Sequence, residues 1–238
     1  WAISMTYIGF VLGAMGADYY PRLTAAMNDH AAVNRMVNEQ TEVALLLAAP
    51  VLLAMMALAP WVIELLYTSK FRPAADVLHW QILGDILKVA SWPLGFIILA
   101  AGDGKTFVLS ETAGVGTFVL LTWLTLPSLG LEASGLSFFG LYALYLPLVF
   151  WLAKRRTKFS WASLVVKQMA LLFAAACLVM LLARYSQAFA AGFGLLLSAV
   201  FGIYGFSRLA HKTELTGWLG NAASRAQLLM KKVGVWHE

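Results

Sequence analysis

Long apolar stretches, separated by short polar segments, follow one another along most of the chain. Each is close to the ~20 residues that a helix needs to cross the hydrocarbon core of a bilayer. They lie at about residues 1–26, 43–67, 75–101, 107–126, 133–153, 164–183 and 187–207. Pro50 and Pro60 interrupt the second stretch, where we expect a kinked helix. The pattern predicts an all-α, polytopic membrane helix bundle of about seven transmembrane helices.

Composition agrees with this interpretation, because 61% of the 238 residues are hydrophobic and only 12% are charged. That balance excludes a soluble globular protein. The formal net charge of +5 points to anionic lipid surfaces as partners, and not to nucleic acid. The single cysteine, Cys177, and the scattered histidines show no metal-ligand spacing, so we expect no metal site and no cofactor.

The basic residues predict the orientation, since Lys and Arg near helix ends stay on the cytoplasmic side. If the stretches alternate in direction, one side holds Arg22, Arg35, Lys105, Lys154, Arg155, Arg156, Lys158, Lys167, Arg208, Lys212, Arg225, Lys231 and Lys232. The other side holds only Lys70, Arg72 and Arg184. We therefore expect a cytoplasmic C-terminus. The start at Trp1, outside and without a signal-peptide pattern, suggests a fragment whose upstream helices are missing.

The third stretch carries the most informative chemistry. Gln81, Asp85 and Lys88 are spaced i, i+4 and i+7, which places them on one helix face, and Trp92 follows one turn later. An isolated charge at the centre of a membrane helix costs ~2.5–3.5 kcal/mol on insertion scales. Both charges must therefore face protein or a water-filled cavity. A structural ion pair and a functional site are equally compatible with this pattern.

Three other groups of residues are candidates for interfacial or functional roles. Glu111 lies one turn into the fourth stretch, close to Lys105. Asp18 and Arg22 have the spacing of a helical ion pair near the cytoplasmic end of the first stretch. Residues 211–238 repeat apolar positions with helical spacing between basic ones, which predicts an amphipathic cytoplasmic tail on the inner leaflet.

The residues around the third stretch resemble a known family. The run Ser69-Lys70-Phe71, then Asp76, Trp80-Gln81, Gly84-Asp85, Leu87-Lys88-Val89 and Glu111, is similar to the Wzx-type flippases of lipid-linked oligosaccharides, with the lipid III and O-antigen translocases among them. Pro21, Leu23 and Thr24 also resemble a helix end of that family. The similarity covers about residues 1–156, and its specific part is Trp80 to Val89.

The resemblance implies a domain organisation. Residues 1–156 correspond to five transmembrane helices, numbers 8 to 12, in the C-terminal lobe of a two-lobed exporter of the multidrug/oligosaccharidyl-lipid/polysaccharide superfamily. Residues 157–210 add two further helices, which the twelve-helix members lack, and residues 211–238 form the tail. Glu64 departs from the apolar residue that close relatives have.

The resemblance also implies a function. The protein is expected to be a multi-pass protein of the bacterial inner membrane, not an enzyme, that moves undecaprenyl-diphosphate-linked oligosaccharide by alternating access for surface polysaccharides such as lipopolysaccharide O-antigen. Polysaccharide polymerase machinery and membrane lipids are the expected partners. Lys88 and Arg22 would bind the diphosphate, Gln81, Trp80 and Trp92 would contact sugars, and Asp85 or Glu111 would take up the coupling ion.

Other functions stay open. A multidrug exporter of the same superfamily shares the fold, and a mostly apolar cavity with a lone carboxylate would favour it. A membrane enzyme acting on a lipid-linked sugar needs acid/base groups at a helix end, and the short loops offer no carboxylate pair beside a His. A purely structural subunit is disfavoured by Asp85 and Lys88.

Overall fold

The computed structural model describes residues 2–212, and the predicted amphipathic tail at 213–238 lies outside the described residues. The described part is all α-helical, without strands, as predicted. Its elements are α1 (Ala2–Ala25), α2 (His30–Leu66), the short 3-10 helix η1 (Ser69–Phe71), α3 (Ala74–Ala100), α4 (Gly104–Leu129), α5 (Glu132–Thr157), α6 (Ser163–Tyr185) and α7 (Gln187–Lys212).

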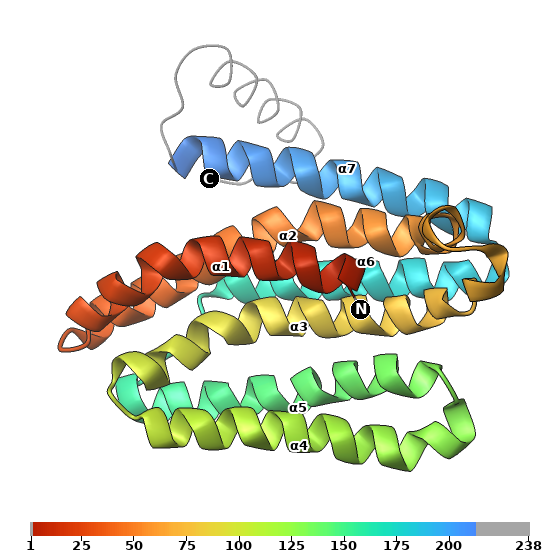
Figure 1. Cartoon of the computed structure of the whole chain (residues 1–238). Helices are drawn as coiled ribbons and strands as arrows, with labels where there is room; N and C mark the ends of the chain where they lie inside the picture. The colour runs from red at the N-terminus through yellow and green to blue at the C-terminus, as the bar shows by residue number, and fades with distance from the viewer. Residues whose placement is uncertain (1, 213–238) are drawn as a thin grey trace.

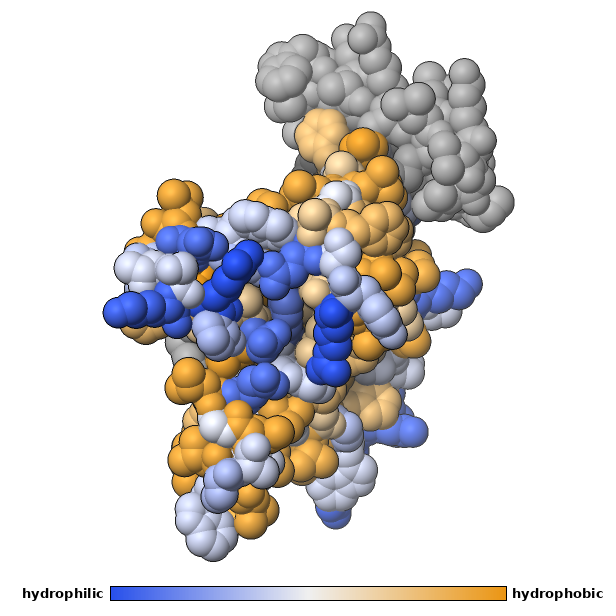
Figure 2. Space-filling model, turned by 90° about the vertical axis from the view of Figure 1, so that its right-hand side faces the viewer, coloured by the Kyte–Doolittle hydropathy of each residue, from blue (hydrophilic) through white to orange (hydrophobic). Residues whose placement is uncertain are grey.

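Length and composition make α2 to α7 able to cross a membrane, six helices among the described residues. In α1 the described side chains give a shorter apolar stretch, Ser4–Gly13. Figure 2 looks along the helices onto the end that holds the α2–α3 and α6–α7 connections. Polar side chains gather on this end surface and apolar ones surround it on the flanks. That distribution is typical of a bundle whose ends leave the bilayer while its sides face lipid.

The helices are stacked in a row, as Figure 1 shows, in the order α7, α2, α3, α5 and α4. Two more helices cover the junction between α2 and α3, with α1 on one side of the row and α6 on the other. The buried core follows from this order, because α2 and α3 have neighbours all around them while α4 contacts mainly α5. Most side chains of α4 are therefore exposed.

The alternation of helices places the basic residues as the sequence predicted for the described part of the chain. The α1–α2, α3–α4 and α5–α6 connections lie at one end of the row, which we call the basic end, at the left in Figure 1. It carries Arg22, Arg35, Lys105, Lys154, Arg155, Arg156, Lys158, Lys167 and Arg208. The opposite end carries Lys70, Arg72 and Arg184.

Helix α2 is longer than the apolar pattern indicated. We expected it to begin near Val43, but it begins at His30. The Asp29 carboxylate caps its first turn by accepting from the amides of Ala31 and Ala32, both at 3.0 Å. The prediction failed because it followed only apolar residues, whereas this first part is polar and extends beyond the apolar stretch at the basic end.

Helix α7 packs directly on the proline-interrupted part of α2. Pro50 has no N–H, so it leaves the carbonyl of Leu46 without its usual helical donor. Gly205 lies against that carbonyl: a Cβ at this position would meet the Leu46 oxygen at 2.9 Å. The Ser198 hydroxyl donates to the Pro50 carbonyl at 2.6 Å. Helix α7 therefore approaches α2 most closely at its proline-interrupted part, where Gly205 leaves room for the Leu46 carbonyl and Ser198 adds a hydrogen bond.

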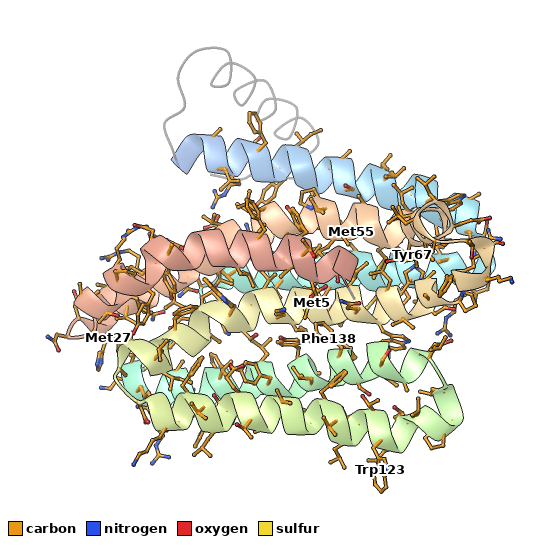
Figure 3. The ribbon with its side chains drawn as sticks, in the orientation of Figure 1. Met5, Met27, Met55, Tyr67, Trp123 and Phe138 are labelled. Carbon is orange, nitrogen blue, oxygen red and sulfur yellow. The ribbon has the colours of Figure 1, made fainter. Side chains whose placement is uncertain are left out.

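Helices α3 and α5 also approach closely, and this contact positions the candidate site. A Cβ on Gly135 would lie 2.5 Å from the Val77 carbonyl oxygen, and one on Gly84 would lie 2.6 Å from the Phe138 ring. Only glycine allows the two backbones to come this near without a shift. Phe138 is thereby placed under α3, where Figure 3 shows it between α3 and α5.

Candidate functional site

A cavity of about 310 Å³ lies between α3, α4 and α5. Its walls are mostly aromatic and apolar, and three chemical groups in them can act on a ligand: an ammonium, a carboxylate and tyrosine hydroxyls. The lining residues are Lys88, Ser91, Trp92, Gly95, Phe96, Phe107, Glu111, Gly114, Val115, Leu141, Tyr142 and Tyr145. The sequence-predicted residues that meet in this cavity are Lys88, Trp92 and Glu111.

Lys88 is held in soft, polarisable surroundings. Its Nζ lies 3.4 Å from the Met5 sulfur and 5.9 Å from the ring centroids of both Phe138 and Tyr142. Figure 3 shows Met5 and Phe138 reaching α3 from opposite sides, from α1 and α5. Aromatic rings attract a cation without neutralising it. No ion pair within 4.0 Å involves Lys88 in residues 2–212, although the Asp85 and Glu111 carboxylates are near enough to act on it electrostatically.

Asp85 lies one turn before Lys88 but does not line the cavity. Its side chain is fully buried, and neither carboxylate oxygen has a hydrogen-bond partner within the described residues. The buried Ser4 hydroxyl of α1 is close to it, and Lys88 acts on it electrostatically. The structure therefore separates the acid from the base: Asp85 is enclosed at the α1–α3 contact, whereas Lys88 borders open space.

Glu111 is the carboxylate that lines the cavity. It projects from α4 and accepts a short hydrogen bond from the Tyr145 hydroxyl of α5. Glu111 is otherwise exposed, so water or a ligand can reach its carboxylate. One wall of the cavity therefore presents a positive group, Lys88, and another a negative group, Glu111, with aromatic rings between them.

Trp92 is the predicted sugar-contacting residue that lies in the cavity wall. Its ring is 4.5 Å from that of Phe96 and 6.2 Å from that of Tyr19 on α1, measured between centroids. A Cβ on Gly16 would come within 3.0 Å of it. Helix α1 therefore fixes the position of this indole from behind.

The remaining predicted residues lie elsewhere. Gln81 is buried in α3, 1% exposed, and Trp80 packs on Phe139 with centroids 5.7 Å apart. Arg22 pairs with Asp18 at 3.0 Å on the surface, as the spacing predicted. It borders a separate cleft of about 360 Å³ between α1 and α2, lined by Tyr19, Arg22, Met36, Glu39, Gln40 and Val43. These side chains do not meet Lys88 in one cavity.

Sequence reasoning missed the partners that α1 and α5 supply. Met5, Phe138, Tyr142 and Tyr145 all contact either Lys88 or Glu111. The usable signal was the Tyr142 and Tyr145 pair, spaced i and i+3 within an otherwise apolar span, because a tyrosine hydroxyl in lipid needs a partner. Nothing in Met5 or Phe138 distinguishes them from ordinary packing residues.

At the basic end, the α3–α4 turn is joined to α5 by a polar cluster. Asp103 accepts from the Thr106 amide at 3.0 Å, from the Thr106 hydroxyl at 2.8 Å and from the Arg156 guanidinium. These donors, with Thr106 first, lower the pKa of Asp103 to about 2. The carboxylate is therefore charged at every physiological pH and fastens one end of the cavity.

No group of three or more His, Cys, Asp or Glu side chains that could hold a metal ion occurs in the part of the chain that the structure describes. The groups that line the cavity are able to attract an anion, through Lys88, to accept a cation or proton, through Glu111, and to stack on an aromatic or sugar ring, through Trp92.

Comparison with known proteins gives two related matches. The chain is 24% identical over 158 residues to the lipid III flippase of Escherichia coli (strain K12), and equally to the lipid III flippase of Shigella flexneri. The matched part covers 65% of this chain and 38% of each relative, so the chain spans well under half the length of these proteins. No family model matches the chain, and no solved structure matches it significantly. Both relatives are flippases, which are transporters, in agreement with the expectation that the chain is not an enzyme.

Proposed function

Because the chain is a distant relative of the Wzx-type flippases and a multi-pass membrane protein, we propose that it forms part of a flippase for a lipid-linked oligosaccharide. The proposed substrate is an undecaprenyl-diphosphate carrying a short sugar repeat, which the protein moves across the bacterial inner membrane. The basic end lies in the cytoplasm in this proposal, as the positive-inside rule requires. The product supplies surface polysaccharide synthesis, including O-antigen of lipopolysaccharide, and its polymerase.

One observation carries the proposal: Lys88 borders a cavity inside the membrane-spanning bundle and has no ion pair within 4.0 Å among the described residues. A diphosphate cannot cross hydrocarbon unaided, because its desolvation cost is very large. An ammonium in a low-dielectric cavity attracts phosphate strongly. Lys88 thus offers a resting point for the headgroup, while the lipid tail stays in the bilayer.

The remaining residues take roles along the same path. Arg22, at the basic end, draws the diphosphate toward the bundle, and Trp92 stacks on a sugar ring in the cavity. Gln81 contacts sugars only after α3 rearranges, since it is buried, whereas Trp80, half-buried against Phe139, contacts sugars outside the Lys88 cavity. Glu111 or Asp85 takes up the coupling ion as the cavity opens and closes.

The second candidate is a multidrug exporter, and the character of the cavity favours it. The walls are mostly aromatic, and Glu111 is the lone carboxylate among the residues that line them. Cationic drugs stack on such rings and pair with a carboxylate. Lys88 opposes this function, because its positive charge repels a cation in the same cavity.

Flipping by the full-length protein in proteoliposomes tests both candidates. We expect Lys88→Gln to lower flipping of the lipid-linked oligosaccharide about tenfold or more, since a hydrogen bond to a charged group is worth ~1.5–3 kcal/mol. Lys88→Arg should restore part of the rate. Lys105→Gln, an exposed lysine outside the cavity, is the matched control. Two results together would overturn the flippase proposal in favour of a drug exporter. Lys88→Gln would leave flipping of the lipid-linked oligosaccharide unchanged, and it would transport a cationic dye faster than the wild type.

A further inference from the structure

The last two turns of α5 present an unusual surface at the basic end. Lys154, Arg155 and Lys158 are all exposed there, and the Trp151 side chain, 53% exposed, lies on the same helix one turn closer to the bilayer centre. The Arg155 guanidinium lies over the Trp151 ring, 5.5 Å from its centroid. We call these four residues the α5 corner.

The bases of the α5 corner form no ion pair with another described side chain. None of the ion pairs within 4.0 Å in residues 2–212 includes Lys154, Arg155 or Lys158. Their neighbour Arg156 is different, because it binds Asp103 and lies 3.3 Å from the Thr106 hydroxyl. Two adjacent arginines therefore have separate tasks: Arg156 fastens the α3–α4 turn, and Arg155 faces outward.

A helix C-terminus favours nearby cations, which explains one base but not the whole arrangement. Lys158 ends α5 in the left-handed region, at φ 55°, so the chain turns away and leaves its side chain exposed beyond the last turn. Behind the corner, the Phe159 and Trp161 rings pack edge to face at 4.9 Å and hold the turn in place. The charged groups are thus presented on a rigid support.

The position of Trp151 indicates the depth of this surface. Tryptophan prefers the boundary between acyl chains and headgroups, where its ring is in an apolar layer and its N–H meets water. If Trp151 lies at that boundary, Lys154, Arg155 and Lys158 are level with the lipid phosphates. A guanidinium already oriented by a ring loses little freedom when it binds phosphate with both of its outer N–H groups.

We infer that the α5 corner is a binding site for the phosphate headgroup of an anionic phospholipid, with Arg155 and Lys158 on the phosphate and an acyl chain alongside Trp151. This site is on the outer surface of α5 and is separate from the Lys88 cavity. The inference does not depend on the proposed transport function.

Native mass spectrometry of the full-length protein in micelles, titrated with phosphatidylglycerol, tests the site. We expect the double variant Arg155→Gln/Lys158→Gln to bind the lipid about 25-fold more weakly, from about fivefold per basic residue at a membrane surface. The matched control, Lys105→Gln/Lys167→Gln, removes two exposed bases from the same end and should change binding less than about threefold. An equal loss in both double variants would reduce the site to general surface charge and overturn it.

Two further measurements separate the lipid from other anions. Glycerol phosphate, which lacks acyl chains, should not compete at the same concentration, and Trp151→Leu should weaken lipid binding while keeping every charge. Competition by glycerol phosphate or by polyglutamate that matches the lipid would assign the corner to a soluble phosphate or an acidic protein instead. Without lipid, the Arg155→Gln/Lys158→Gln variant should melt only slightly below the wild type, since it loses helix-end and cation–ring interactions, whereas Arg156→Gln should melt lower still.

Discussion

Two acidic side chains within the membrane-spanning helices have opposite surroundings. Asp85, at the contact of α1 with α3, is fully buried and has no hydrogen-bond partner within the described residues. Glu111, in the cavity between α3, α4 and α5, is exposed and accepts from the Tyr145 hydroxyl. Asp103, at the basic end, accepts from three donor groups.

The difference shows that the residue type does not decide what an acid in a membrane protein can do. A carboxylate without hydrogen-bond donors or water has an unfavourable free energy when it is ionised. Such a group therefore favours a bound proton or a bound cation. A carboxylate that borders open space can exchange with whatever enters. In this conformation a ligand in the cavity can reach Glu111, whereas Asp85 is closed off from the cavity.

Replacing Asp85 and Glu111 by lysine, one at a time, is the strongest test of the difference between their surroundings. We expect Asp85→Lys to lose ~3 kcal/mol or more of stability, because a new charge in a closed apolar contact has neither solvent nor partner. Glu111→Lys should lose less, ~1–2 kcal/mol, since it loses the hydrogen bond from Tyr145 while its ammonium can reach open space. Thermal melting of both variants, followed by size-exclusion chromatography in detergent, gives the two values. Equal losses at both positions would show that Asp85 is not enclosed.

Removing the Tyr145 hydroxyl tests how much its hydrogen bond to Glu111 stabilises the fold. Tyr145→Phe deletes the donor that holds Glu111, and we expect a loss of ~1–2 kcal/mol. Tyr142→Phe, in the same helix and cavity wall, is the control and should lose less than ~0.5 kcal/mol. The same melting experiment measures both. A larger loss in Tyr142→Phe than in Tyr145→Phe would contradict the hydrogen bond as the source of the effect.

Neutralising the enclosed acid should leave the fold almost unchanged. Asp85→Asn is isosteric and breaks no hydrogen bond of the described residues, so we expect stability within ~1 kcal/mol of the wild type. If Asp85 carries the coupling ion, the same variant loses gradient-driven flipping in proteoliposomes while it still folds. Retained coupling in this variant, combined with its loss in Glu111→Gln, would assign the ion to the cavity acid.

Substitution of Asp103 should have the smallest effect on stability, and this effect should depend on pH. Its pKa in the folded protein is lowered to about 2, below the unfolded value of ~3.9, so the stabilisation is complete above pH ~4. It decreases as the pH falls from there toward 2. We expect Asp103→Asn to melt lower than the wild type at neutral pH and to lack this part of the acid transition. Parallel melting curves from pH 7 to pH 3 check it, and a difference that does not shrink toward acid would contradict the linkage.

The hydrophobic pattern predicted the helices well and the site only in part. The apolar stretches became α1 to α7, but the polar first part of α2 was missed, because the Asp29 cap and not hydrophobicity begins that helix. The i, i+4, i+7 spacing correctly placed Asp85 and Lys88 on neighbouring positions of α3. It did not reveal that one of them meets α1 and the other meets the cavity, since a helical wheel contains no neighbouring helices.

The sequence by itself determined that the chain is a membrane helix bundle with most of its basic residues at one end. Those properties depend on sums over many residues, such as the transfer of apolar stretches into lipid and the charge near helix ends. Only the tertiary structure decided which polar groups meet. The glycine contacts of α3 with α5 bring Phe138 and Tyr142 to Lys88, and the contact of α4 with α5 brings Tyr145 to Glu111. Such pairings depend on distances of a few ångströms between residues far apart in sequence, which spacing along one helix does not encode.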